Sequence, residues 1–238
     1  MLFVKLLFAH LIADFMLQPH KWVVHKEVHK VRSKYLYFHI LLHCGLYLLF
    51  FWNLNLWYLA VAIALLHGLI DLLKLYATPH FKNGTIPFFT DQFLHIMVLY
   101  VVVYFSDLPD HFVGLVSTIN WFLVTAIFFV SFPAAIIMSK ILEGMSAQIE
   151  TDHRSLPNAG KYIGILERLF VLAFMVLGHW EGIGLLITAK SVFRFHDLKE
   201  RNNRKLTEYI LIGTLVSFGL AMLTGLLYTF FHMPEGIG

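Results

Sequence analysis

Long apolar stretches alternate with short polar segments along the chain. A membrane-spanning helix needs about 20 mostly apolar residues, and seven stretches approach or exceed that length. They cover residues 2–17, 36–52, 54–73, 93–105, 112–138, 163–188 and 209–231. The first and fourth are short, so we expect them to be buried among neighbouring helices, and Pro133 should kink the fifth. The pattern predicts an all-α, polytopic integral membrane helical bundle with six or seven membrane segments.

The composition favours the same class. Of the 238 residues, 58% are hydrophobic and 14% are charged, whereas a soluble domain usually carries about 25% charged residues. The lipid bilayer is therefore the expected partner. The formal net charge of +3 is too small to indicate nucleic-acid binding, and we expect no nucleic-acid partner. The single cysteine, Cys44, excludes an internal disulfide bond.

The charges between the apolar stretches predict the orientation of the helices. Residues 20–34 include Lys21, Lys26, Lys30, Arg32 and Lys34, against one acidic residue. The positive-inside rule places such a segment in the cytoplasm. We expect a solvated, cationic loop here, in a multi-pass protein of the cytoplasmic (inner) membrane.

A second basic segment, residues 189–206, conflicts with this orientation. Seven simple crossings would put it outside, against the same rule. A re-entrant hairpin over 163–195, broken near Gly178, Gly182 and Gly184, would return it to the inside. Both arrangements are open at this point. We divide the chain into a four-helix, His/Asp-rich membrane core at 1–105 and C-terminal membrane helices at 106–238, with a basic loop at 189–206.

Each of the first four apolar segments carries two ionisable side chains four positions apart, and therefore on one helical face. Such groups are costly in a bilayer and mark function by default. With about 1.5 Å rise per residue, alternating helices bring all four pairs to one depth, near the membrane face that bears residues 20–34. The pairs are His10 and Asp14, His39 and His43, His67 and Asp71, and Asp91 and His95.

The pairs also hint at an internal repeat. The motif His10-Leu-Ile-Ala-Asp14 is similar to His67-Gly-Leu-Ile-Asp71, and a second polar pair follows each motif on the next helix. Two helical hairpins of parallel orientation, related by an axis along the membrane normal, would arrange the pairs around a common centre.

Imidazole and carboxylate groups are the usual donors for zinc and related divalent metals. Because eight donors exceed one tetrahedral shell, we expect a cofactor of one or two divalent ions, with zinc as the first candidate. A bound ion would activate water for hydrolysis, with Asp71 or Asp91 as the catalytic base. The leading hypothesis is a metal-dependent hydrolase of a lipid or membrane-associated substrate. The alternatives are a divalent-cation or proton-coupled transporter using the same layer, and a metal-free membrane scaffold.

Further polar residues are candidates for binding an anionic lipid or a phosphate-bearing substrate. Some lie beside the pairs, and others bracket the sixth apolar stretch. In the re-entrant arrangement the residues that bracket the sixth stretch would approach the layer of His/Asp pairs. In a simple crossing they would lie at opposite faces of the membrane and act as ordinary anchors. The candidates are Gln18, Lys74 and Gln92 in the first set, and Glu167, Arg168, Lys190 and Arg194 in the second.

These motifs resemble a known family. The run His10-Leu-Ile-Ala-Asp14-Phe-Met-Leu-Gln18, then His43, His67-Gly-Leu-Ile-Asp71-Leu-Leu-Lys74 and Asp91-Gln92-Phe-Leu-His95, is similar to a bacterial polytopic membrane family known as domain of unknown function 3307. The resemblance covers residues 1–105, and stretches at 160–168, 189–195 and 208–215 resemble its longer members. The family implies no activity. A looser similarity, in His/Asp pairs within helices, is to membrane-bound metal-dependent hydrolases.

Overall fold

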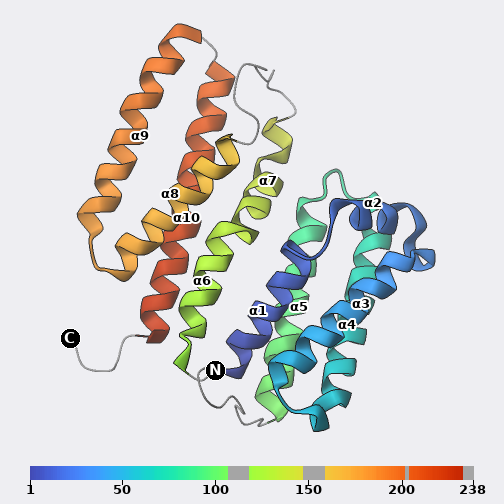
Figure 1. Ribbon diagram of the computed structural model, residues 1–238. Helices are drawn as coiled ribbons and strands as arrows, with labels where there is room; N and C mark the ends of the chain where they lie inside the picture. The colour runs from blue at the N-terminus through green and yellow to red at the C-terminus, as the bar shows by residue number, and fades with distance from the viewer. Residues whose placement is uncertain (107–117, 147–158, 202–203, 233–238) are drawn as a thin grey trace. The chain divides into compact units, whose positions relative to one another are not determined.

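The protein folds into helices that form two compact units. The computed structural model describes residues 1–106, 118–146, 159–201 and 204–232, and within them it contains helices and no β-strand (Figure 1). Unit 1 comprises Met1–Trp121 and unit 2 comprises Phe122–Gly238. The predicted all-α class is confirmed.

Five helical segments in the described part of the chain are long and apolar enough to cross a membrane. They are Lys34–Phe51, Leu54–His80, Thr85–Ser106, Trp121–Ser146 and Lys205–Phe231. A sixth is added if Leu2–Phe15 and His20–Arg32, which meet at 79°, are counted as one broken span. The upper count of six agrees with the lower predicted number. The predicted crossing at 163–188 is not among these segments, because those residues are divided between two helices.

Unit 1 is a four-helix bundle with an additional short helix. Helices α1 (Leu2–Phe15), α3 (Lys34–Phe51), α4 (Trp57–Ala77) and α5 (Thr85–Ser106) alternate in direction (Figure 1). Contacts join α1 to α3, α3 to α4, α4 to α5 and α5 back to α1, so the four helices close into a ring. This packing turns one face of every helix toward a shared centre.

Helix α5 is longer than its hydrophobicity predicted. It begins at Thr85 rather than at residue 93, so the expectation of a short fourth helix was wrong. Pro87 stands in its first turn, where a missing backbone N–H costs no helical hydrogen bond. The polar residues that follow lowered the apolar signal, although one of them, Asp91, is buried inside the bundle.

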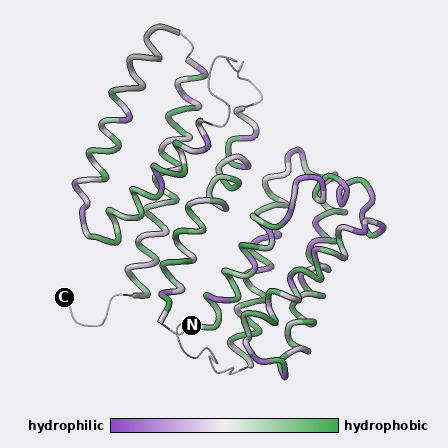
Figure 2. Tube along the Cα trace, viewed as in Figure 1, coloured by the Kyte–Doolittle hydropathy of each residue, from purple (hydrophilic) through white to green (hydrophobic). Residues whose placement is uncertain are grey.

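The predicted basic loop at 20–34 is helical. It forms α2 (His20–His29) and a 3₁₀ turn, η1 (Lys30–Arg32), at one end of the bundle, where hydrophilic residues of unit 1 gather (Figure 2). Helix α2 packs on α3, and η1 packs on α4. The segment is thus held against the bundle as a helix rather than a loop, and most of its side chains are at least partly exposed, as predicted, whereas Lys26 is only 5% exposed.

Unit 2 is built from α7 (Pro133–Ser146), α8 (Ala159–Val176), α9 (Trp180–Arg201), α10 (Arg204–His232) and most of α6 (Trp121–Ser131). Helix α10 packs mainly on α8 and α7. The break between α6 and α7 falls at Pro133, as predicted, because proline removes an internal helical hydrogen bond. The core is lined by Ala126, Val130, Val171, Leu172, Met175, Ile183, Phe218 and Ala221.

The sixth apolar stretch folds back on itself. Helices α8 and α9 are joined at Gly178, whose φ of 75° lies in the left-handed region that favours glycine. An ion pair of 2.5 Å between Lys190 Nζ and Glu167 Oε2 links the two arms. A single crossing over 163–188 is therefore wrong, and so is a basic loop at 189–206, because α9 remains helical through Arg201.

Close contact between α3 and α4 depends on Gly68. A β-carbon at this position would lie 2.3 Å from Ile40 Cδ1 and 2.7 Å from Ile40 Cγ1, well inside van der Waals contact. The neighbouring residue, His67, is one of the buried ionisable residues. The absence of a side chain at Gly68 therefore lets α4 approach α3 at the depth of the polar pairs.

We predict that Gly68→Leu lowers the thermal unfolding temperature of the purified protein, because overpacking at a helix contact costs about 1–3 kcal/mol. Gly45→Leu is the matched control, since nothing lies within 4 Å of a β-carbon at that exposed position of α3. Equal unfolding temperatures for the two variants in detergent would show that the Gly68 contact is not limiting.

Candidate metal centre

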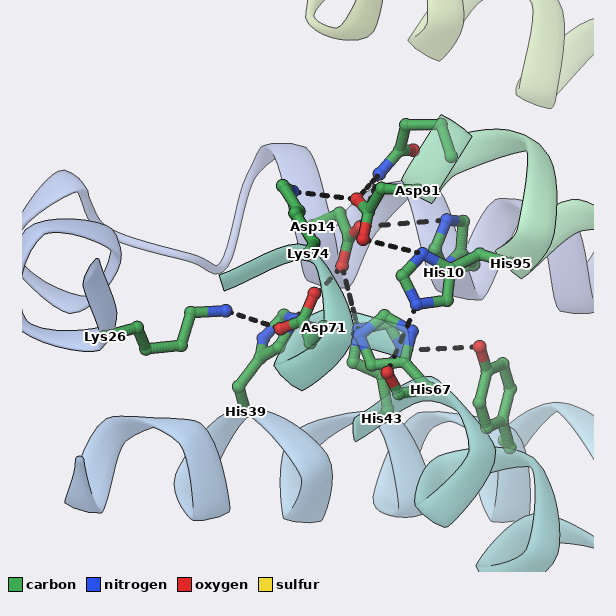
Figure 3. A network of polar contacts seen from close by, with 12 residues as sticks. His10, Asp14, Lys26, His39, His43, His67, Asp71, Lys74, Asp91 and His95 are labelled. Atoms are coloured by element: carbon green, nitrogen blue, oxygen red, sulfur yellow. Dashed lines mark hydrogen bonds and ion pairs between the residues drawn. The ribbon is translucent and has the colours of Figure 1, made fainter. Parts of the chain in front are cut away.

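The eight ionisable residues of the four helical pairs meet in the centre of unit 1 (Figure 3). All four helices of the ring contribute two side chains each. Seven of the eight residues are at most 5% exposed, and the eighth, Asp14, has a side chain that is 10% exposed. The predicted layer is thus a single cluster, composed of His10, Asp14, His39, His43, His67, Asp71, Asp91 and His95.

The first group of donors in this layer surrounds Asp14. His10, Asp14, His43 and His67 each offer a ligand atom within 4.8 Å of the others. Asp14 Oδ1 lies 2.9 Å from His43 Nε2 and 3.7 Å from His67 Nε2. His39 Nε2 is also near, at 3.1 Å from the same oxygen. Imidazole nitrogens from three helices, α1, α3 and α4, therefore lie close to the carboxylate of Asp14.

These separations resemble the distances between ligands of one metal ion. Zn–N and Zn–O bonds of about 2.0–2.2 Å in a tetrahedron put ligand atoms about 3.3 Å apart. The donor–donor distances around Asp14 range from 2.9 Å to 3.7 Å. A small rearrangement of side chains would therefore suffice to bring these donors into one coordination shell.

Among the described residues, no hydrogen bond accounts for the position of His10. It is 0% exposed, and neither ring nitrogen has a hydrogen-bond partner in that part of the chain. Its Nε2 lies 3.7 Å from Asp14 Oδ2, and its ring is 5.2 Å from that of His95 and 5.5 Å from that of His67. Buried polar groups in proteins are nearly always satisfied, so the donor set fits a site for a cation.

Two further groups extend the layer. The second contains His39, His67 and Asp71, and the third contains Asp71, Asp91 and His95. His67 Nε2 lies 3.1 Å from His39 Nε2, so His67 belongs to the first and second groups. Asp71 likewise joins the second and third. Because the three groups share His67 and Asp71, their donors could be divided between one or two ions.

Hydrogen bonds outside the layer orient two of the imidazoles. His95 Nε2 donates to the backbone oxygen of His67 at 3.2 Å, which leaves Nδ1 facing Asp91 Oδ1 at 3.8 Å. His43 Nδ1 pairs with the Tyr47 hydroxyl at 3.2 Å, which directs Nε2 toward Asp14. Such outer partners fix the tautomer and the ring orientation of metal-ligating histidines. The sequence prediction missed Tyr47, although it follows His43 by one helical turn.

Two lysines, the buried Lys26 and the partly exposed Lys74, neutralise the remaining carboxylates. Lys26 Nζ lies 2.6 Å from Asp71 Oδ2, and Lys74 Nζ lies 2.7 Å from Asp91 Oδ2. Lys74 was a predicted site residue, and Figure 3 shows both lysines beside their carboxylates. Lys26 was missed because its position among exposed basic residues gave no sign that it would turn into the bundle.

Two glutamines complete this side of the layer. Gln92 Nε2 donates to Asp14 Oδ2 at 3.0 Å and to Asp91 Oδ2 at 3.2 Å, so it bridges two carboxylates. Gln18 lines a cavity of about 330 Å³ that also borders Lys26, Lys74 and Asp71. The cavity therefore connects the layer to the end of the bundle that carries α2.

The opposite side of the layer is closed. One helical turn away from the donors, each helix of the ring places a large side chain on the same inward face. These side chains are at most 1% exposed, and three of the four are aliphatic. They are Leu6, Tyr47, Ile63 and Leu99, which we call the sealing layer.

The remaining predicted site residues belong to unit 2. Glu167 and Lys190 form the ion pair between α8 and α9, and Arg168 is buried beside them in α8. Arg194 lies in α9 but outside the residues whose side chains are described.

A family match covers the whole buried His/Asp cluster. The family described as "Protein of unknown function (DUF3307)" matches residues 2–130, more than half of the chain. The protein belongs to the DUF3307 family. Comparisons with curated proteins and with solved structures give no match.

The DUF3307 match includes every donor of the layer, both lysines that pair with its carboxylates, and Tyr47. It extends beyond the resemblance at 1–105, through α5 and into α6. Glu167, Arg168 and Lys190 lie outside it. The part of this DUF3307 protein that matches its family is therefore the part that holds the buried His/Asp cluster.

We predict that Lys26→Met strongly destabilises the chelator-treated DUF3307 protein, by about 3–5 kcal/mol, because it leaves the buried carboxylate of Asp71 without its counterion. The double variant Lys26→Met/Asp71→Leu should recover most of that loss, since no unpaired charge remains. Denaturant unfolding in detergent measures both effects.

Lys21→Met, an exposed change in the same helix, serves as the control and should alter the free energy of unfolding by less than about 1 kcal/mol. If Lys26→Met were as stable as Lys21→Met, the ion pair with Asp71 would not be a structural element of the bundle.

Proposed function

We propose that this protein is a membrane-embedded, metal-dependent hydrolase that acts on a lipid or another membrane-associated substrate. The observation that carries the proposal is the layer of buried His and Asp side chains, which borders a cavity on one side and is sealed on the other. Zinc is the metal that the mixed imidazole and carboxylate donors suit best.

The chemistry of the donors supports a reactive centre rather than a structural zinc site. Structural sites are usually closed by four ligands rich in cysteine, whereas catalytic sites use histidine and carboxylate and keep a position for water. When bound, a divalent ion would supply an activated water and polarise the oxygen of an ester. The first group around Asp14 would take the ion first, because lysines already neutralise Asp71 and Asp91.

The cavity suggests an anionic substrate. Its lining holds the three lysines Lys26, Lys30 and Lys74 and the two carboxylates Glu27 and Asp71 around a space of about 330 Å³, so the ammonium groups are in excess. Lysine is a common ligand for phosphate. A substrate with a phosphate ester in its head group would place that group beside the donors and leave its apolar part in the bilayer.

Asp71 is the best candidate for the general base, because it both belongs to the donor layer and lines the cavity. In the hydrolysis of a phosphate ester, the water oxygen bonds to phosphorus while the bond to the leaving oxygen breaks. Asp71 would take a proton from the water and return it to the leaving oxygen. Asp91 does not line this cavity and would act as a ligand.

The sealing layer argues against transport. A transporter needs a path to both faces of the membrane, whereas Leu6, Ile63 and Leu99 close the bundle one turn beyond the donors. We further propose that the end bearing α2 faces the cytoplasm of a bacterial cell, with the protein in the inner membrane, because that end carries the excess of lysine and arginine.

The first test is the metal content of protein purified without chelators. We expect stoichiometric zinc in the wild type and in His80→Ala, an exposed histidine outside the layer. His67→Ala should lose most of the metal because His67 belongs to two of the three donor groups. Wild-type protein without stoichiometric metal would remove the proposal and favour a polar scaffold.

The second test separates hydrolysis from transport. Zinc-loaded protein should hydrolyse a p-nitrophenyl alkyl phosphate, and Asp71→Asn should lower kcat by about 10²–10⁴-fold, the usual contribution of a general base. The variant should still contain zinc. No turnover by the zinc-loaded wild type, together with zinc entry into proteoliposomes that His67→Ala abolishes, would assign transport instead.

A further inference from the structure

Unit 2 contains a second large cavity, which does not involve the His/Asp cluster. It measures about 690 Å³ and is lined by residues of α7, α8 and α10, together with Lys190 of α9. Its lining mixes apolar side chains with a few cationic and hydroxyl groups. The apolar part consists of Ala135, Ile136, Met138, Leu142, Ile163 and Ile210.

Arg168 lies in the wall of this cavity and is only 3% exposed. Its Nε donates to the backbone oxygen of Val130 at 2.6 Å, in the last turn of α6, where a helix leaves carbonyl groups without partners. Its Nη1 lies 3.4 Å from Ser217 Oγ and 3.5 Å from Met138 Sδ. Its Nη2 has no hydrogen-bond partner.

The charge of Arg168 is not compensated among the side chains that the structure describes. No carboxylate oxygen in that set lies within 4.0 Å of the guanidinium, and the adjacent Glu167 is engaged with Lys190 at 2.5 Å. Burying an unpaired charge is expensive. The hydrogen bond to the backbone oxygen of Val130 accounts for one N–H group of the guanidinium. It does not neutralise the positive charge of Arg168.

The cavity as a whole is also cationic. Its lining holds Lys140, Lys161, Arg168 and Lys190 against Glu167 as the one carboxylate. Lys140 is near Glu143, at 3.3 Å, whereas Lys161 is exposed at the start of α8. The space thus combines a buried positive charge, a surplus of lysine and a large apolar wall.

We propose that this cavity binds an anionic phospholipid, with the phosphate at Arg168 and Ser217 and an acyl chain against the apolar wall. Arginine suits this role because its guanidinium presents parallel donors to phosphate oxygens. The apolar wall favours a lipid over free phosphate. Two of the four helices that line the cavity, α7 and α10, belong to segments long and apolar enough to span the bilayer, which brings it within reach of lipid.

This site is independent of the hydrolase proposal, since all its residues belong to unit 2 and lie outside residues 2–130. The test uses delipidated full-length protein in detergent, titrated with phosphatidylglycerol, phosphatidylcholine or inorganic phosphate. Native mass spectrometry measures bound lipid, and the unfolding temperature measures stabilisation by each ligand. Zinc content is followed in parallel and should not change in any variant.

We expect phosphatidylglycerol to bind and to raise the unfolding temperature, with little effect from the other two ligands. Arg168→Gln should weaken phosphatidylglycerol binding by about tenfold or more, the effect of losing a charged hydrogen bond. Lys161→Glu should weaken it several-fold, and Lys205→Glu, an exposed change in α10 outside the cavity lining, should not. Gly160→Phe, which adds a ring where nothing lies within 4 Å, should reduce binding by filling the mouth.

Each other result overturns the proposal. Equal binding of phosphatidylcholine would make the cavity a non-selective lipid groove, and equal stabilisation by inorganic phosphate would make the ligand a soluble anion. Wild-type affinity in Arg168→Gln would show that Arg168 only caps the broken helix. If Arg168→Gln does not fold, the variants Lys161→Glu and Gly160→Phe test the proposal. Unchanged affinity of both variants for phosphatidylglycerol would reject the site.

Discussion

The structure of unit 1 depends on keeping charged and imidazole groups stable where water is excluded. A buried charge without a partner is too expensive for a bundle of this size to tolerate. Every carboxylate of the layer therefore has a cationic or hydrogen-bonding neighbour: Asp14 has imidazoles and Gln92, Asp71 has Lys26, and Asp91 has Lys74. This requirement explains why the short helix α2 is folded against the bundle end.

The same requirement determines which groups of the layer remain free to bind a metal ion. The charge of each carboxylate has a compensating neighbour, whereas within the described residues neither ring nitrogen of His10 has a hydrogen-bond partner, and neither do the Nδ1 atoms of His39, His67 and His95. Electron-pair donors left free at the centre of a bundle are what a metal site requires. The lysines at the cavity and the aliphatic sealing layer then give this centre one open side.

Unit 2 meets the constraint differently. Its buried charge, Arg168, is partnered by neutral groups only, a backbone carbonyl, a hydroxyl and a sulfur. A neutral shell satisfies some of the hydrogen bonds of a guanidinium but not its charge. Unit 1 thus supplies counterions from within the chain, whereas the cavity in unit 2 is suited to an anion from the membrane.

The sequence by itself determined the helical class, the break at Pro133 and the layer of four polar pairs, because hydrophobicity and the 3.6-residue period are local properties. It did not reveal the helical form of residues 20–32 and 189–201 or the ion pair of Lys26 with Asp71, and it left the hairpin at Gly178 as one of two open arrangements. In the sequence, Lys26 looks like any solvated lysine of a basic segment. Its burial follows only from the packing of its helix, which brings it to the carboxylate of Asp71. Only the tertiary structure decided which charges meet, since partners such as Lys26 and Asp71 are distant in sequence and are brought together by the closed ring of helices.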